Sequence, residues 1–256
     1  MFSLDDTLLP MAKSKDIETV WSTHGRAMRA LGFDRMVYGF TRFPIHGRNI
    51  GVGEVNDALV LSNHSPDYME YFVGKRMYLH GPMTRWASEN EGTCSWRMIA
   101  QMAEAQTLSA DELEVIQINQ RFAVTAGYTI SFHSGTDTTK AAIGLAARRG
   151  LSQDDVEQIW AAHHAFIELS SYLMHLQVSR LPHKSGLIHR LSQRQQEVLQ
   201  WAAQGKTGDE MAQIMGLTRA TVEKHLRLAR AALNSTTTAH AVMKASSANL
   251  FLSMKP

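Results

Sequence analysis

Residues 191–233 read LSQRQQEVLQWAAQGKTGDEMAQIMGLTRATVEKHLRLARAAL and contain three helix patterns separated by two short breaks. Each predicted helix starts at a residue whose side chain caps helices well: Ser192, Thr207 and Thr218. Gln195 lies three residues after Ser192 and completes a capping box. Gly205 and Gly216 stand where a C-terminal glycine ends a helix. The stretch therefore predicts three consecutive helices joined by tight turns.

Each predicted helix carries an apolar stripe at helical spacing, which indicates a shared core. The stripes comprise Val198, Leu199, Ala202 and Ala203, then Met211, Ala212, Ile214 and Met215, then Val222, Leu226, Ala229 and Leu233. The other side of the third helix is basic, with Arg219, Lys224, Arg227 and Arg230. Two helices joined by a Gly-containing turn, the second with a basic outer face, are typical of a helix-turn-helix. The pattern alone also fits a small helical bundle with a solvated charged face.

Three runs within the stretch carry a family resemblance: EVLQWAAQGKT at 197–207, EMAQIMGL at 210–217 and TVEKHL at 221–226. At this spacing they resemble the DNA-binding domain of LuxR-type transcription regulators, over about residues 191–248. Gln195 departs from the Glu that is usual there, but Gln can also close a capping box. Glu223 stands where the family is often basic, and it could accept from a cytosine amino group or face solvent.

Double-stranded DNA is thus the predicted macromolecular partner, with contacts assigned from helix geometry. Lys224 and Arg227 are expected to reach bases or steer the third helix, with Glu223 beside them. Phosphate contacts are expected from a second group: Thr207, Thr218, Arg219, Thr221 and Arg230. Helix-turn-helix proteins commonly bind as dimers, so a homodimer is expected. A final helix at about 237–248 presents a stripe of Ala241, Val242 and Ala245, which could pair with its copy or pack inside its own domain.

The charge distribution agrees with a DNA-binding C-terminal part. From Lys184 onward the chain has ten Lys or Arg and four Asp or Glu, whereas the net charge of the whole chain is only +2. Cys94 is the single cysteine, so no internal disulfide can form, which suits a reducing compartment. The N-terminus lacks the pattern of a signal peptide, and no apolar run is long enough to span a membrane. These features predict a cytoplasmic protein.

The N-terminal part predicts a mixed α+β domain. Helix patterns cover 16–31, 65–77, a short run from Pro82, 109–124 and 152–180, and strand patterns cover 35–42, 58–62, 94–96, 128–134 and 141–147. The last two strands flank a polar turn and indicate a hairpin. We expect four or five strands in an antiparallel sheet with helices on its faces. The predicted domains are 1–180 and 191–256, joined by a basic linker at 181–190.

This order of elements, over about residues 15–178, resembles the α/β/α sandwich that binds N-acyl-homoserine lactones in quorum-sensing LuxR-type regulators. The family's pocket signature is Trp, Tyr, Asp-Pro, Trp and a strand-starting Gly. Anchored on Pro82 and Trp96, it falls on these residues: Tyr68, Phe72, Gly81, Pro82, Trp96 and Gly127. Three positions match, two keep aromatic character, and Gly81 replaces the acid.

The lost acid matters because the resemblance implies a buried carboxylate that accepts the ligand's amide N–H. A charge-assisted hydrogen bond of this kind contributes about 1.5–3 kcal/mol. His64 and His80 are candidate substitutes for the acid, although both could be surface residues. The Tyr68 hydroxyl could donate to a ring carbonyl of the ligand, and Thr129 is a further candidate for ligand binding. The aromatic residues could also be plain core. We therefore predict a relative with a modified pocket, which binds another apolar ligand, binds lactones weakly or folds without ligand.

Other functions fit the sequence less well. It has no nucleophile elbow, no HExxH motif, no phosphate-binding loop and no paired-cysteine metal spacing, so we expect neither an enzyme nor a cofactor or metal site. A regulator that needs no ligand, or a protein that sequesters other LuxR-type regulators through its N-terminal domain, remains compatible with the missing acid.

Overall fold

The computed structural model describes residues 6–41, 58–133, 139–181 and 191–247. The chain forms two compact units, Met1–Ser179 and Arg180–Pro256. The predicted linker at 181–190 lies outside the described residues except for Leu181.

The N-terminal unit is built on one antiparallel sheet with strand order β2-β1-β5-β4-β3. The strands are β1 Phe33–Thr41, β2 Leu59–Ser62, β3 Gly92–Ser95, β4 Gly127–Ser131 and β5 Lys140–Ala147. β4 and β5 are direct antiparallel neighbours, with Tyr128 opposite Leu145. The predicted hairpin and the predicted antiparallel sheet are therefore confirmed.

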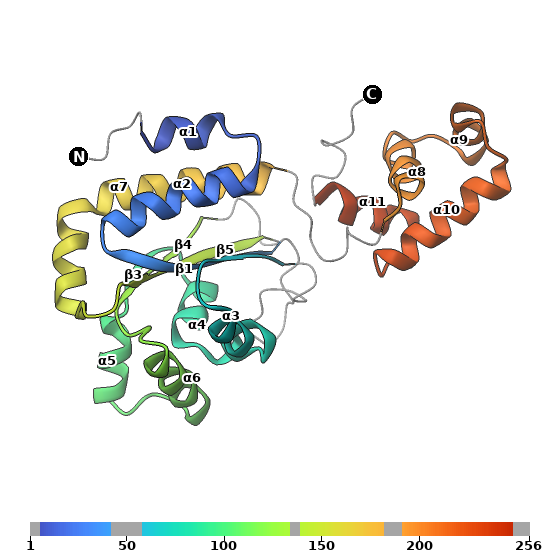
Figure 1. Cartoon of the computed structure of the whole chain (residues 1–256). Helices are drawn as coiled ribbons and strands as arrows, with labels where there is room; N and C mark the ends of the chain where they lie inside the picture. Colours follow the sequence, from blue (N-terminus) through green and yellow to red (C-terminus); the bar gives the residue numbers. More distant parts are fainter. Residues whose placement is uncertain (1–5, 42–57, 134–138, 182–190, 248–256) are drawn as a thin grey trace. The chain divides into compact units, whose positions relative to one another are not determined.

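Helices cover both faces of this sheet, which confirms the predicted α/β/α sandwich (Figure 1). One face is covered by α2 Ile17–Ala30 and α7 Gln153–Arg180, and α1 Leu8–Lys13 packs on α2. The other face is covered by α3 Pro66–Met69, α4 Pro82–Glu89, α5 Arg97–Glu104 and α6 Ala110–Arg121. The sheet thus separates two layers of side chains.

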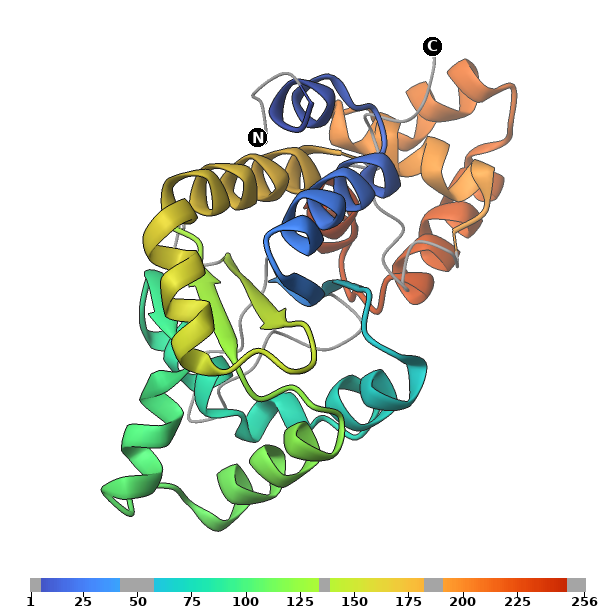
Figure 2. The same ribbon diagram turned by 60° about the vertical axis from the view of Figure 1, so that its left-hand side comes forward.

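α2 and the C-terminal half of α7 lie side by side over the sheet, as Figures 1 and 2 both show. His24 of α2 is fully buried between them, and its Nδ1 lies 2.8 Å from Ser170 Oγ of α7. Burial lowers the pKa of His24 to about 3, because the charged imidazolium would lose its hydration. His24 is therefore a neutral core residue.

The predicted helix at 65–77 is wrong, because the structure divides this segment. α3 is followed by a π-helix η1, Glu70–Gly74, and a 3₁₀-helix η2, Met77–His80. The Lys75 N–H donates to Glu70 O at 2.8 Å, five residues back, and Arg76 has a left-handed φ of 59°. A non-glycine residue in this conformation ends a helix.

Trp96 was predicted to be extended, but it begins α5 with φ −70° and ψ −2°. Its backbone N–H still donates to Gly127 O at 3.1 Å, so the chain leaves the sheet at this residue. Neither α5 nor α1 has a counterpart among the helices predicted from the sequence.

The C-terminal unit contains four helices among the described residues: α8 Gln193–Ala203, α9 Gly208–Met215, α10 Arg219–Ala232 and α11 Thr238–Ser247. Ser192, Thr207 and Thr218 cap the first three as predicted, and Gly216 has the expected left-handed φ of 64°. The predicted stripes form one core, with two exceptions. Ala203 is exposed, and the side chain of Ile214 is 47% exposed because it lies on the outer side of α9.

α11 joins the core of its own unit. Ala241 and Ala245 are completely buried against the same cluster as Val222 and Leu226, and Val242 packs against that cluster. Of the two readings of this stripe, the structure supports packing inside the domain. The stripe is therefore not an exposed surface for a second copy.

Candidate ligand cavity and nucleic-acid interface

A cavity of about 580 Å³ lies in the N-terminal unit against the sheet face that α3 to α6 cover. The strand sequences explain why a cavity forms on this face and not on the other. Successive side chains of a strand point to opposite faces of the sheet. Toward α2 and α7 the central strands present completely buried large residues: Tyr38, Ile130, Ile143 and Leu145. Toward the cavity the same strands present Gly39, Ala142 and Gly144. The small residues leave room that the opposing helices do not fill.

The cavity wall is mainly apolar and has a few polar groups, as binding sites for small molecules usually do. Trp96 donates its Nε1–H to Thr129 Oγ1 at 2.9 Å, and Tyr68 donates its hydroxyl to Asn119 Oδ1 at 3.0 Å. These four residues line the cavity, and no Asp or Glu is among the described residues that do so. The arrangement can orient an apolar molecule by neutral hydrogen bonds.

Three aromatic rings form a stack on one side of the cavity. The His64 and Tyr68 rings are 4.4 Å apart between centroids, and the Tyr68 and Phe72 rings are 5.5 Å apart. Burial, together with the nearby Arg35 charge, lowers the pKa of His64 to about 4. Burial also raises the pKa of Tyr68 well above its usual value. Both groups are therefore neutral at pH 7.

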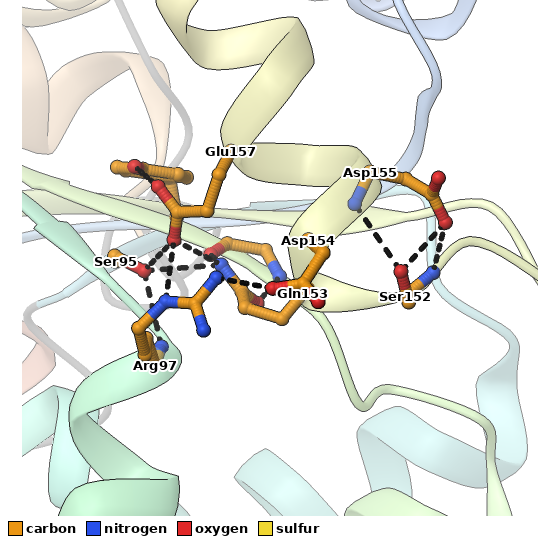
Figure 3. A network of polar contacts seen from close by, with 9 residues as sticks. Ser95, Arg97, Ser152, Gln153, Asp154, Asp155 and Glu157 are labelled. Atoms are coloured by element: carbon orange, nitrogen blue, oxygen red, sulfur yellow. Dashed lines mark hydrogen bonds and ion pairs between the residues drawn. The ribbon is translucent and has the colours of Figure 1, made fainter.

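A polar network fixes the backbone on each side of Trp96 (Figure 3). Glu157 of α7 accepts from the hydroxyls of Ser95 and Tyr128 and, at 3.0 Å, from Gln153 Nε2. Arg97 Nη2 lies 2.6 Å from Asp154 Oδ1, and Arg97 Nε lies 3.6 Å from Glu157 Oε1. Burial opposes ionisation of Glu157, but these hydrogen bonds and Arg97 hold its pKa below the usual value.

Gln153 extends the network to the start of β4. Its Oε1 accepts from the Gly127 N–H at 2.9 Å, and its Nε2 donates to Gly127 O at 3.2 Å. Because Ser95 and Arg97 flank Trp96 in the chain, the first turn of α7 holds the cavity tryptophan in place. The cavity wall and α7 are thus one connected structure.

The outward side of α10 is the candidate nucleic-acid interface. Glu223, Lys224 and Arg227 are exposed, whereas Val222 and Leu226 of the same helix are buried. Within the described part of the chain, Lys224 and Arg227 form neither a hydrogen bond nor an ion pair. An exposed helix face with unpaired cations can enter the major groove of DNA.

Other residues predicted to contact DNA already have partners within the unit. Thr207 exchanges hydrogen bonds with Glu210 in a capping box, and the Thr218 and Thr221 hydroxyls are 2.9 Å apart. Arg230 is half-buried and donates to Thr238 Oγ1 at 2.9 Å, which ties α10 to α11.

Arg219 is a different case, because its partner is exposed. Arg219 Nη1 lies 3.0 Å from Asp209 Oδ2, and both side chains are mostly exposed. Ion pairs of this kind contribute about 0–1 kcal/mol. Arg219 can therefore exchange Asp209 for a phosphate.

Both units of the chain match known protein families. Residues 16–178 match the model of the autoinducer binding domain, and residues 189–245 match that of the bacterial regulatory proteins of the luxR family. The chain belongs to the LuxR family. It is a transcription regulator of the quorum-sensing type, with an autoinducer-binding domain and a helix-turn-helix DNA-binding domain.

Two transcription regulators are among the similar proteins. The chain is 29% identical over 212 residues to the quorum sensing-dependent regulator RpaR of Rhodopseudomonas palustris, covering 81% of each chain. It is 27% identical over 227 residues to the activator SolR of Ralstonia nicotianae, covering 85% of this chain and 86% of SolR. No helix in the described residues of this LuxR-family chain has the length and apolar character needed to cross a membrane.

Two solved structures share the fold. SdiA in complex with octanoyl-rac-glycerol has a TM-score of 0.52 at 16% identity, covering 94% of this chain and 92% of SdiA. CepR2 of Burkholderia cenocepacia, described as an N-acylhomoserine-lactone-dependent LuxR-family factor, has a TM-score of 0.51 at 15% identity. That match covers 68% of this chain and 95% of CepR2.

Most residues predicted for the LuxR-type pocket line the cavity: His64, Tyr68, Phe72, Gly81, Pro82, Trp96 and Thr129. His80 and Gly127 do not. His80 is half exposed, with its Nδ1 3.3 Å from Asp111 Oδ2. A Cβ added to Gly127 would lie 2.2 Å from Leu145 O and 3.0 Å from the Trp96 ring. The lack of a side chain at Gly127 therefore permits both the strand pairing and the position of the Trp96 ring.

The lining also includes residues that the sequence did not single out, among them Thr84, Asn119 and Lys140. Thr84 lies one helical turn after Gly81, and its Oγ1 would be 3.1 Å from a Cβ added to Gly81. Residues three apart at the start of a helix are neighbours, so this spacing could have identified Thr84 from the sequence. Asn119 and Lys140 come from α6 and β5, far from the motif in sequence, so only the tertiary structure brings them to the cavity.

Proposed function

We propose that this LuxR-family regulator senses a small molecule with an apolar body. Its N-terminal cavity binds that molecule through side chains other than carboxylates. The observation that supports this most strongly is a largely apolar cavity of about 580 Å³, lined by Trp96 and Tyr68 and, among the described residues, by no Asp or Glu. Binding sites of 300–1,000 Å³ are typical for small molecules. A neutral hydroxyl such as that of Thr84 can accept a hydrogen bond where the carboxylate is missing.

For DNA binding, we propose that α10 enters the major groove. Lys224 and Arg227 contact bases, and Arg219 contacts a phosphate after it releases Asp209. Helix-turn-helix regulators bind paired half-sites as dimers, and we infer a homodimer that acts on DNA in the cytoplasm. The buried stripe of α11 does not provide the dimer contact, so other surfaces must do so.

Restoring an acid at position 81 tests the modified pocket. The unaltered chain is expected to bind N-acyl-homoserine lactones weakly, and Gly81→Asp is expected to tighten binding about ten- to a hundredfold. The reason is that a charge-assisted hydrogen bond to the ligand amide contributes about 1.5–3 kcal/mol. Isothermal titration of the full chain with lactones of graded acyl length gives both affinities.

Gly81→Asn is the matched control, because its side chain has the same size but no charge. Both variants must displace Thr84 Oγ1, which would be only 3.1 Å from the new Cβ. The proposal predicts a gain for Asp that exceeds the gain for Asn. Tight lactone binding by the unaltered chain, with no gain for Gly81→Asp, would show that the carboxylate is dispensable here.

A further inference from the structure

The ionisable side chains on the described part of the cavity wall include more basic than acidic groups. Arg97 and Lys140 are basic, His64 is neutral, and the described part of the lining contains no Asp or Glu. Asp154 and Glu157 of the α7 network balance Arg97, at 2.6 Å and 3.6 Å. The remaining formal charge among the lining residues that the structure describes is the ammonium group of Lys140.

Lys140 is the first residue of β5 and lies opposite Thr41 of β1, which also lines the cavity. Its Nζ donates to Asn90 O at the end of α4, at 2.9 Å. An ammonium group has three hydrogens, and among the described residues this is the only hydrogen bond that Lys140 forms. Two donors are therefore left for another acceptor.

The surroundings of Lys140 do not neutralise it fully. Burial lowers its pKa, and the negative charge of Glu91 opposes that shift. Glu91 is engaged elsewhere, because its Oε2 lies 2.6 Å from His133 Nδ1. Lys140 is thus a half-buried cation that forms no ion pair with a described residue, and an anion that enters the cavity would stabilise it.

We propose that the preferred ligand is an amphiphile with one carboxylate and an apolar chain, of the fatty-acid class. The carboxylate pairs with Lys140 Nζ, and the chain lies along apolar lining residues of α5 and α6 such as Ile99, Leu113 and Ile116. This inference rests on the proposed ligand-sensing function and specifies the chemistry of the ligand. A lactone or an ester with the same chain lacks the charge and leaves the ammonium group with Asn90 O alone.

The experiment compares three ligands of equal acyl length with the full chain: dodecanoate, methyl dodecanoate and N-dodecanoyl-homoserine lactone. Isothermal titration is carried out at pH 7 below the concentrations at which these molecules form micelles. The unaltered chain is expected to bind dodecanoate about tenfold or more tightly than the methyl ester, because a charged hydrogen bond replaces a neutral one.

Lys140→Gln is expected to remove this preference and to leave the affinity for the ester within about twofold, because Gln can still donate to Asn90 O. Lys140→Arg is expected to keep the preference. Lys13→Gln, at an exposed lysine of α1, is the control for the loss of one positive charge elsewhere. Circular dichroism establishes that each variant is folded before titration.

The outcomes separate the inference from the function on which it rests. A preference for the ester or the lactone overturns the inference but leaves a ligand-sensing cavity. A preference for dodecanoate that persists in Lys140→Gln also overturns it, since the carboxylate then binds elsewhere. If the unaltered chain binds none of the three molecules, the proposed sensing of apolar ligands fails together with the inference.

Discussion

Replacing both Lys224 and Arg227 with alanine is expected to abolish recognition of a specific DNA site while the protein stays folded. Each side chain contributes about 1–3 kcal/mol if it contacts a base, so the pair together should cost about 2–6 kcal/mol. That range corresponds to about a thirtyfold to a twenty-thousandfold loss of affinity. Folding should be unaffected because both side chains are exposed and have no partner within the described residues.

Fluorescence anisotropy measures this loss on a duplex that the unaltered chain has enriched from a random DNA pool. Arg194→Ala is the control, because Arg194 is also exposed and basic but lies on α8 and pairs with Glu197 at 2.8 Å. An equal loss on random DNA would assign Lys224 and Arg227 to the phosphate backbone. Undiminished binding of the double variant to the enriched site would remove α10 from the DNA interface.

Gly127→Ala is expected to destabilise the N-terminal unit by about 3 kcal/mol or more, a large part of the stability of an ordinary domain. The added Cβ would lie 2.2 Å from Leu145 O, which is backbone of the adjacent strand. It would also lie 3.0 Å from the Trp96 ring, which is held by its hydrogen bond to Thr129. Neither neighbour can move without breaking the sheet or the cavity wall.

Gly144→Ala is the matched control in the adjacent strand. Its added Cβ would have Val37 Cγ1 as nearest neighbour at 3.6 Å, which is an ordinary van der Waals contact. Urea unfolding followed by tryptophan fluorescence should therefore show a change of about 1 kcal/mol or less for Gly144→Ala. Similar unfolding midpoints for the two variants would contradict the close packing at Gly127.

The C-terminal domain was predictable because local interactions define it. Side-chain caps at Ser192, Thr207 and Thr218 and the left-handed Gly216 are encoded within a few residues of each helix end. The two exceptions, Ala203 and Ile214, show the limit of this reasoning, since helical spacing alone does not decide how wide the buried stripe is.

The sheet was predictable as well. The family resemblance located one part of the cavity lining, including Tyr68 and Trp96, but not the open sheet face or the rest of the wall. The alternation Ala142-Ile143-Gly144-Leu145 contains the signal for a sheet with one filled and one open face. Recognising it requires knowing which face the helices leave unfilled. Asn119 and Lys140 reach the cavity through tertiary packing, which no local pattern specifies. His80 was a candidate because it precedes Gly81, but the 3₁₀ turn of η2 directs it to Asp111.

The central claim is that the cavity of the N-terminal unit binds an apolar small molecule. Titration with the neutral fluorophore N-phenyl-1-naphthylamine tests this claim most directly. Ala142→Phe places a large ring on the cavity lining, whereas Ala161→Phe makes the same change on the exposed side of α7. The unaltered chain and Ala161→Phe are predicted to show saturable fluorescence with one probe per chain, and Ala142→Phe is predicted to show none. No saturable binding by the unaltered chain, or equal binding by all three proteins, would contradict the claim.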